Sequence, residues 1–238
     1  MLVWPLSPEG ISMFTGLIEA TGTIRALETK HGKTRITVAG PPSLVRRLHT
    51  GDSVAVSGVC LTALDINIDS NLFSADLAAE TITRTSLSRL HPGSIINLEL
   101  PTPAGTPMGG HVVQGHVDGV GTVQWLEPVH SNAKRTAIDW RLRLSVPEEC
   151  ARYIVAQGSI TVEGISLTVA RVEGASVEIA VIPHTYAATN VHTLSKGSPV
   201  NIEVDVMAKY AERLADSSAE KEVEAFELTL EYLIANGY

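Results

Sequence analysis

The sequence predicts an all-β protein composed of two tandem, homologous antiparallel barrels followed by a C-terminal α-helix. Three observations lead to this prediction. Short segments of alternating polar and β-branched residues recur along the chain, turn residues separate them about every ten positions, and five segments occur twice in the same order. Regularly spaced short strands are typical of antiparallel barrels and sandwiches.

Composition and charge exclude several classes of protein. The chain has 238 residues, of which 44% are hydrophobic, which is enough for one large core or two small ones. Its formal net charge is -8, and we find no cluster of Lys and Arg of the kind that binds a phosphate backbone or an acidic membrane surface. We therefore expect neither a nucleic-acid partner nor a membrane partner.

The cysteines and histidines give no sign of a disulfide framework or a metal site. The two cysteines, Cys60 and Cys150, are not in a CxxC pair, and the eight histidines lack a zinc-binding spacing such as HExxH. We expect no metal and a reducing, cytoplasmic location.

The N-terminus does not have the features of a targeting segment. Residues 1–12, MLVWPLSPEGIS, contain no positive leader, and their apolar run is too short for a signal peptide. We interpret them as a disordered extension preceding Met13. No stretch of the chain approaches the roughly 18 apolar residues that a membrane span needs.

Seven segments have the length and pattern of strands. They are TRITVAG, DSVAVSG, NLFSADL, SIINLEL, RLRLSV, SITVEG and SVEIAVI. Two shorter segments, Pro42 to His49 and Pro147 to Val155, each predict one or two helical turns that begin with proline.

The internal repeat is a duplicated domain. Its clearest element is GVCLT at Gly58 to Thr62, which recurs as GISLT at Gly164 to Thr168, and the other repeated segments lie about a hundred residues apart as well. That period is too long for a solenoid. The remaining pairs are TGLIEATGTI with QGHVDGVGTV, the two helical turns, AAETITRTSL with IPHTYAATNV, and PGSIINLEL with KGSPVNIEV.

These repeats set the domain boundaries. PTPAGTPMGG, at Pro101 to Gly110, is rich in Pro and Gly and is the predicted linker. We predict an N-terminal barrel at 13–108, a C-terminal barrel at 109–210 and a helix at 211–238.

The C-terminal segment has the pattern of an amphipathic helix. Ser217 and Glu220 fit a capping box, and Asn236-Gly237 fits a helix end. An apolar stripe at helical spacing follows the box, at Val223, Phe226, Leu230 and Leu233. The stripe packs either on its own barrel or against other subunits.

Six motifs together resemble the riboflavin synthase alpha-chain family, from Met13 to about Tyr210. They are MFTGLIE, GVCLT, GGHVVQGHVDGVG, GISLT, IPHT and VNIEVD, in the order and spacing of that family. The resemblance implies two six-stranded Greek-key barrels of the flavin-reductase-like type. It also implies a homotrimer formed through the C-terminal helix and a reaction without a cofactor.

The implied reaction is a dismutation. Two molecules of 6,7-dimethyl-8-ribityllumazine exchange a four-carbon unit to give riboflavin and 5-amino-6-(D-ribitylamino)uracil. The family's site lies between the N-terminal barrel of one subunit and the C-terminal barrel of its neighbour. Two copies of one ligand are then held face to face by two copies of one barrel, which replaces a bimolecular collision by an effectively unimolecular step.

The chemistry requires a proton to be removed from a ring methyl group, followed by nucleophilic attack on the second ring. His116, in QGHVDG, is a candidate acid and base because imidazole titrates near neutral pH. Its alternative role is a hydrogen bond within a turn. We interpret His111, in GGH, as structural.

Five more residues are assigned to catalysis by the resemblance. The family pattern places Cys60 and Ser53 in the N-barrel site, where the thiol either adds to a ring carbon or only positions it. Asp205, which follows VNIEV, orders the acceptor in the family, although without the resemblance a turn-capping carboxylate would be the preferred interpretation. The hydroxyls of Ser166 and Thr168 complete the assignment.

The resemblance also predicts the residues that contact substrate. Glu80 and Thr81, with His184 and Thr185 in the matching place, are assigned to the ribityl hydroxyls. The full predicted set is Gly16, Leu17, Ile18, Cys60, Leu61, Thr62, Asp76, Leu77, Ala78, Ala79, Glu80, Thr81, Gly115, His116, Val117, Gln157, Ser166, Leu167, Thr168, Ile182, Pro183, His184, Thr185, Tyr186 and Ala187.

The chain departs from the family pattern at three places. Gln157 stands where the family commonly has lysine, which replaces a charge-assisted hydrogen bond by a neutral one. Glu163 replaces an aspartate, and the segment before GGH lacks the usual basic residues. These changes concern substrate affinity more than reaction type.

Three other functions make different demands on the sequence. A non-catalytic carrier of lumazine or flavin would use the same barrels, and Gln157 slightly favours it. A flavin-dependent reductase would need a βαβ unit with GxGxxG, which the sequence lacks. A nucleic-acid-binding barrel conflicts with the acidic charge and with an aromatic content of only 5%. The sequence carries no information about an association with lumazine synthase.

Overall fold

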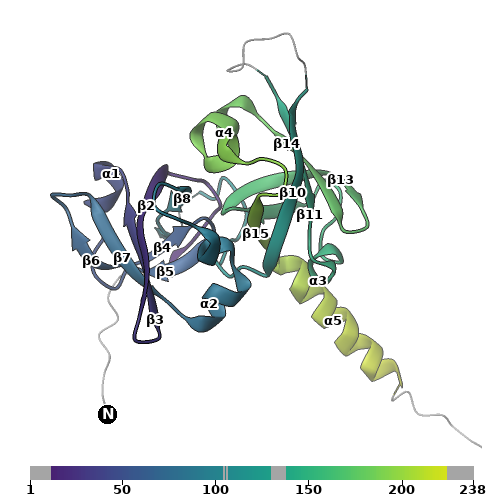
Figure 1. The fold of residues 1–238 in the computed structure, drawn as a ribbon. Coiled ribbons are helices and arrows are strands. Elements are labelled where there is room, and N and C mark those ends of the chain that lie inside the picture. Colours follow the sequence, from purple (N-terminus) through teal and green to yellow (C-terminus); the bar gives the residue numbers. More distant parts are fainter. Residues whose placement is uncertain (1–11, 104, 106, 130–137, 224–238) are drawn as a thin grey trace, which may run out of the picture. The chain divides into compact units, whose positions relative to one another are not determined.

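The computed structural model describes residues 12–103, 105, 107–129 and 138–223. The chain divides into two compact units, one that ends at Asp205 and one that begins at Val206. The first unit contains two β-barrels, which Figure 1 shows in purple to blue and in teal to green.

The N-terminal barrel is formed by seven strands in the spatial order β5-β4-β8-β2-β3-β7-β6, all paired antiparallel. The strands β5 and β6 are one strand interrupted at a single residue. This barrel therefore has six strand positions, as the resemblance implies. The strands are β2 Ala20–Lys30, β3 Lys33–Ala39, β4 Ser53–Val56, β5 Val59–Thr62, β6 Leu64–Asn67, β7 Leu72–Leu77 and β8 Ile95–Glu99.

Ala63 separates the two strands. The Ala63 N–H donates to the Asp52 carbonyl, and the Ala63 carbonyl accepts from the Gly51 N–H. Asp65, two residues later, has φ of +44°. The strand bends at this point and resumes as β6.

The C-terminal barrel is closed, in the order β10-β11-β14-β13-β12-β15, with β15 paired again to β10. Here the strand equivalent to β5 and β6 is continuous, with a bulge between Val169 and Arg171. The strands are β10 Gly119–Pro128, β11 Trp140–Ser145, β12 Ser159–Val162, β13 Ile165–Glu173, β14 Ser176–Val181 and β15 Pro199–Val204. All seven strands predicted from alternation are present.

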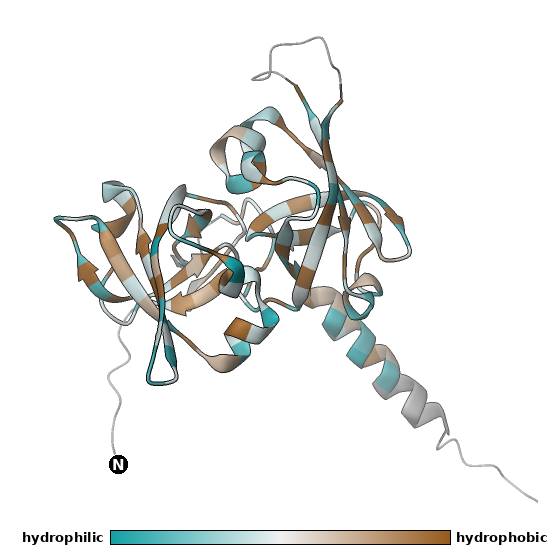
Figure 2. Ribbon diagram, viewed as in Figure 1, coloured by the Kyte–Doolittle hydropathy of each residue, from teal (hydrophilic) through white to brown (hydrophobic). Residues whose placement is uncertain are grey.

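Each barrel encloses its own apolar core. Inward-facing residues alternate with polar outward ones along the strands, which gives the alternating brown and teal of Figure 2. Full burial of one such aliphatic or aromatic side chain contributes about 1.5–3 kcal/mol. Among the fully buried residues are Ile36, Phe73 and Leu98 in one barrel and Leu142, Ile160 and Ile179 in the other.

The two predicted helical turns are confirmed, although they are shorter than predicted: α1 Pro42–Val45 and α3 Glu148–Ala151. The first begins with proline, whereas Pro147 stands just before the first helical residue of α3. The sequence pattern did not reveal a second pair of helices. These are α2 Ala79–Arg84 and α4 Pro183–Ala188, each followed by a 3₁₀ turn, η1 Ser86–Arg89 and η3 Asn190–Thr193. In both pairs a threonine separates the helix from the turn, and its hydroxyl accepts from the backbone N–H two residues later.

The final helix, α5, spans Val206–Val223 and so begins before the predicted position 211. The expected capping box at Ser217 is wrong, because Ser217 lies inside the helix. The stripe residues Phe226, Leu230 and Leu233 and the expected stop at 236–237 lie outside the described residues. Among the described residues, no helix is long and apolar enough to cross a membrane.

The predicted linker is partly a strand. Within it, β9 Thr102–Pro103 pairs antiparallel with β1 Ser12–Met13. An isolated bridge joins Phe14 to Val113 just beyond this pair. Ser12 therefore belongs to a strand rather than to the N-terminal extension, and the other residues of that extension lie outside the described ranges.

The two barrels contact each other at the first residue of each repeated motif, GVCLT and GISLT. Gly58 and Gly164 lie against each other so closely that a Cβ added to Gly58 would be 2.7 Å from the Gly164 nitrogen, and the reverse distance would be 2.6 Å. Both residues have positive φ, +81° and +80°. Glycine is required at both positions by conformation and by space.

A buried polar network surrounds this contact. The Asn97 amide donates to the Asn190 side chain and to the Glu163 carbonyl, and the Asn201 amide donates to the Ser57 carbonyl. The Glu163 carboxylate accepts from the Asn201 N–H at 2.7 Å and from the Asn190 amide at 2.9 Å. All these groups are buried. Since a buried polar group without a partner is costly, the network fixes one arrangement of the two barrels.

Alanine at Gly58 should destabilise the protein far more than alanine at a glycine with the same backbone conformation and free space. Gly58→Ala adds a methyl group in contact with the opposite backbone, and we expect unfolding to require about 3 kcal/mol less free energy. Gly32 has φ of +75° and nothing within 4 Å, so Gly32→Ala should cost only about 1 kcal/mol. Urea unfolding of both variants measures the difference, and equal losses would contradict the packed contact.

The carboxyl group of Glu163 should make stability depend on pH. Burial raises its pKa above the ordinary 4.5, although hydrogen bonds from Asn201, Ser57 and Asn190 oppose the shift. A raised pKa contributes stability that is present below the ordinary value and is lost as pH rises through the folded value. We therefore expect the stability of the wild type relative to Glu163→Gln to fall over an interval that begins at the ordinary pKa of 4.5 and extends upward through the raised folded-state pKa. A difference that is constant with pH would show that this group does not titrate in that interval.

Candidate functional site

Two short segments cross between the barrels and form the base of the candidate site. In the first, the Thr15 N–H and the Gly16 N–H donate to the Glu99 carboxylate of the N-terminal barrel, at 2.7 and 3.1 Å. The Gly16 carbonyl then accepts from the Ser166 N–H of the C-terminal barrel at 2.8 Å. Burial raises the pKa of Glu99, and the Thr15 and Gly16 hydrogen bonds oppose this shift.

The second segment repeats this arrangement in reverse. The Gln114 and Gly115 N–H groups donate to the Glu203 carboxylate at 2.8 and 3.1 Å. The Gly115 carbonyl accepts from the Cys60 N–H of the N-terminal barrel at 2.9 Å. Each repeated phrase, GVCLT or GISLT, therefore pairs with the segment that leads into the opposite barrel.

Glycine at both crossings permits this approach. A Cβ on Gly16 would lie 2.6 Å from the Ser166 Cβ, and one on Gly115 would lie 2.6 Å from the Cys60 Cβ. Both glycines have positive φ, +75° and +76°. The conformation exposes Leu17 after the first glycine and His116 after the second.

The N-terminal barrel carries an open pocket of about 200 Å³ beside the second crossing. Six of the predicted site residues line it: Cys60, Glu80, Thr81, Gly115, His116 and Val117. Three further residues complete the wall and were not predicted, namely Val59, Arg84 and Thr85. The geometry thus brings GVCLT, the start of α2 and QGHVDG to one place.

Cys60 separates this pocket from a second cavity. The second cavity, of about 330 Å³, contains Ser53 together with Phe14, Pro101 and Val113. The half-buried thiol has a raised pKa, mainly because of burial, with a hydrogen bond to Ser53 opposing the shift and the Glu203 charge adding to it. Cys60 is therefore a neutral thiol at neutral pH, which favours packing or positioning over covalent attack.

The C-terminal barrel brings together a histidine, a serine and an aspartate. His111 Nδ1 lies 2.7 Å from the Ser166 hydroxyl, and His111 Nε2 lies 3.1 Å from the Thr161 hydroxyl. Burial lowers the pKa of His111, while the charge of Asp205 acts in the opposite direction. The imidazole is thus neutral near pH 7, hydrogen-bonded on both nitrogens, and close to a carboxylate that would stabilise its protonated form.

His111 is a functional candidate that the sequence interpretation set aside as structural. Its imidazole contacts the hydroxyls of Ser166 and Thr161, the Ser166 distance being the shorter, and it feels the charge of Asp205. The spacing of GGH to GISLT along the chain gives no hint of this. The signal that could have found it is the duplication, since the crossing segment that begins near His111 is equivalent to the one that begins at Ser12.

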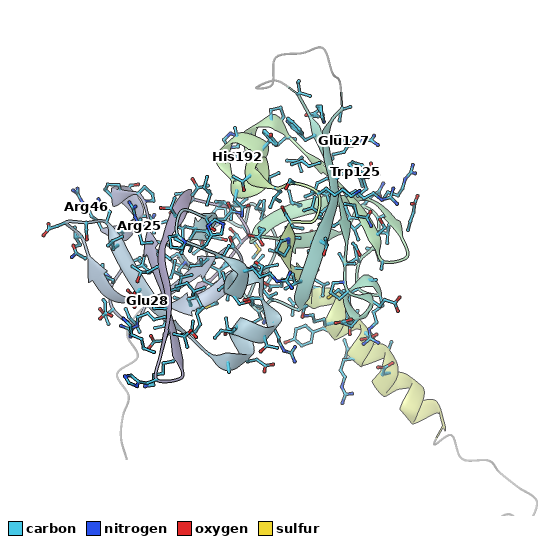
Figure 3. All side chains as sticks on the ribbon, viewed as in Figure 1. Arg25, Glu28, Arg46, Trp125, Glu127 and His192 are labelled. Atoms are coloured by element: carbon cyan, nitrogen blue, oxygen red, sulfur yellow. The ribbon has the colours of Figure 1, made fainter. Side chains whose placement is uncertain are left out.

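Other predicted residues lie in structural roles. Asp76 pairs with Arg35 at 2.6 Å, which lowers the pKa of the Asp76 carboxyl group. Tyr186 is buried and stacks on Trp140 with ring centroids 4.0 Å apart, and His192, labelled in Figure 3, approaches its edge at 6.3 Å. Gln157 is exposed in the turn before β12, with φ of +67°. Their substrate contacts remain predictions.

The remaining predicted residues lie in the strands and crossings or in the short helices α2 and α4. Thr62 and Thr168 are exposed and face Ser53 and Ser159 across matching strand pairs. Ile182 is 57% exposed just before α4. A separate cavity of about 400 Å³ between η1 and η3 contains none of the predicted residues. In the described part of the chain, no group of acidic, histidine or cysteine side chains could hold a metal ion.

The geometry therefore defines a protein with two homologous barrels in one chain, of which the N-terminal one carries an open pocket. A family model described as "Lumazine binding domain" matches it twice, over residues 15–101 and 114–205. The solved structure of LumP complexed with riboflavin has a TM-score of 0.72 and 23% identity, and covers 81% of this chain and 99% of its own. LumP complexed with 6,7-dimethyl-8-(1'-D-ribityl) lumazine gives a TM-score of 0.70 and 22% identity over the same shares.

Curated relatives specify the family further. A riboflavin synthase of Mycobacterium bovis is 42% identical over 87% of this chain and 100% of its own length. Those of Actinobacillus pleuropneumoniae and Bacillus subtilis are each 37% identical over 95% of this chain and all of their own. This chain belongs to the riboflavin synthase family, and the resemblance inferred from its motifs is confirmed.

The reactivity of the Cys60 thiol should report its hydrogen bond to Ser53. Cys150 is buried, so in the native protein an aromatic disulfide reagent should modify only Cys60. The midpoint of the rate against pH should lie above the usual value near 9.0. Ser53→Ala removes an interaction that lowers the pKa and should raise the midpoint further, whereas Glu203→Gln should lower it. A midpoint below 9.0 in the wild type would contradict the assignment.

Proposed function

We propose that this protein is a riboflavin synthase that converts two molecules of 6,7-dimethyl-8-ribityllumazine into riboflavin and 5-amino-6-(D-ribitylamino)uracil. The observation that carries the proposal is the reciprocal crossing of the barrels. Each repeated motif, GVCLT or GISLT, pairs with a segment that leads into the other barrel. The chain therefore holds two related sites of different chemistry. A reaction between two copies of one compound requires this combination.

The His111 cluster suits removal of the methyl proton. A neutral imidazole has one unprotonated nitrogen, which takes up the proton through the hydroxyl bonded to it, and the charge of Asp205 stabilises the imidazolium that results. The Ser166 hydroxyl, 2.7 Å from Nδ1, orients the ring and lies at the crossing next to Gly16. Methyl deprotonation leaves a carbanion conjugated with the lumazine ring, which attacks the second ring.

The N-barrel pocket suits retention of the second lumazine. Glu80 and Thr81 face the ribityl hydroxyls, and His116 supplies an exposed imidazole for the later proton transfers. Cys60, with its raised pKa, positions the ring as a neutral thiol. The protein's part is to hold both reactants in register, and correct orientation of two reactants lowers such barriers by several kcal/mol.

Assembly into a homotrimer completes the proposal. Three exposed apolar residues, Met207, Tyr210 and Leu214, are spaced at three and four positions along α5, which is the spacing of one helix face. We propose that this face contacts other subunits in a homotrimer in which an N-terminal barrel lies beside the C-terminal barrel of a neighbour. We further infer a cytoplasmic location and a reaction without a cofactor.

A non-catalytic carrier is the second candidate. The LumP structures, which share the fold, are complexes with lumazine, riboflavin and flavin mononucleotide. Gln157, in place of the family's lysine, favours this reading. The cluster of His111, Ser166 and Asp205 favours the enzyme, because a carrier has no use for a base.

A turnover assay distinguishes the two. Purified protein is mixed with 6,7-dimethyl-8-ribityllumazine, without any addition, and riboflavin is followed by absorbance and chromatography. One riboflavin for every two lumazines consumed, over many turnovers, is the expected result. Binding without turnover would establish the carrier instead.

On the acid side, kcat should fall at a lower pH than it would with an ordinary histidine as the base. Because burial lowers the pKa of His111 from 6.5, the neutral base persists to lower pH, and kcat should have its acid midpoint below 6.5. Asp205→Asn removes a charge that raises this pKa, so the midpoint should move lower still while kcat falls. A midpoint that moves upward in Asp205→Asn would contradict the role of His111.

A further inference from the structure

The helices α2 and α4 are equivalent residue by residue. Each has six residues, follows an extended residue, and ends at a threonine with φ near −124°: −123° at Thr85 and −124° at Thr189. The Thr85 hydroxyl donates to the Thr81 carbonyl at 2.6 Å, and the Thr189 hydroxyl donates to the Thr185 carbonyl at 2.7 Å. Differences between the helices are therefore differences between side chains at matching places.

Two of these differences occur together. In α2, Glu80 and Arg84 form an ion pair one helical turn apart, and both line the N-barrel pocket. In α4 the matching residues are His184 and Ala188, so the carboxylate and its guanidinium partner are both replaced. All four side chains are exposed.

The pair gives the N-barrel pocket an anionic acceptor with a cationic partner beside it. A carboxylate accepts hydrogen bonds from hydroxyl groups more strongly than a neutral ring nitrogen does. Arg84 limits the side-chain freedom of Glu80 before a ligand arrives, which reduces the entropy lost on binding. In α4, His184 offers at most one acceptor nitrogen when neutral, and Ala188 cannot orient it.

We propose that the Glu80–Arg84 pair makes the two sites of the chain unequal, so that the N-terminal barrel binds its polyol-bearing ligand first and more tightly and the C-terminal barrel binds second. Glu80 is the contact and Arg84 is its positioning residue. The inference rests on the proposed function, because it assumes that each barrel binds a ribityl compound. Unequal affinities would let one copy be held while the other enters and leaves.

Riboflavin is a suitable probe because it is the product of the proposed reaction. It undergoes no further reaction when it is the only ligand present. Its fluorescence, titrated against the full chain at pH 8, should show two classes of site that differ roughly tenfold in dissociation constant, the usual gain from a hydrogen bond to a charged group. Arg84→Met should weaken only the tighter class. Arg84→Lys should restore most of the loss, because it keeps a positive charge within reach of Glu80.

Transfer of the ion pair to α4 is the decisive test. His184→Glu combined with Ala188→Arg rebuilds the pair in α4 and should bring the weaker class to within about twofold of the tighter one. Each single substitution should give less than half of that gain, because neither supplies both the acceptor and its partner. Thermal unfolding of every variant checks that the fold is kept.

Three results would overturn the inference. These are equal affinities in the wild type, both constants unchanged in the double variant, or a loss in Arg84→Met shared equally by both classes. If riboflavin and lumazine fail to bind at all, the proposed function fails, which is a different result from binding to two equal sites.

Discussion

The reciprocal crossing of two backbone segments is the constraint on which the rest of the structure depends. Each segment is anchored by a buried carboxylate of its own barrel, Glu99 or Glu203, and then forms a hydrogen bond with the opposite barrel. The backbone N–H groups at the crossing have no strand partner, so a buried acceptor is needed to satisfy them. Loss of either carboxylate would leave buried donors unpaired and release a candidate site residue, Leu17 or His116.

The same constraint explains the repeated phrase. Glycine is required where the barrels touch, at Gly58 and Gly164, and the residues that follow are required to face the crossing segments. The third residue of the motif can differ, and it is Cys60 in one copy and Ser166 in the other. One copy became a neutral thiol in the N-terminal pocket, and the other became the hydroxyl partner of His111.

The strands, the duplication and the fold class could be predicted from the sequence because they depend on local alternation and on repetition. The helices α2 and α4 could not, since six-residue segments such as AETITR carry no helical stripe and are fixed by the threonine and 3₁₀ turn that follow. In the site, the motifs located six residues of one pocket. Arg84 and His111 were missed because their importance comes from a neighbour, Glu80 or Ser166, which only the folded chain brings into contact.

The crossing also changes what the linker does. A chain with two domains joined only by 101–110 would come apart if that connection were cut. Here Ser166 bonds to Gly16 and Cys60 bonds to Gly115, with Gly58 packed on Gly164 between them, so the halves are joined at several points that do not involve the linker. The peptide connection is therefore one attachment among several, because each half also supplies backbone groups that the other half binds.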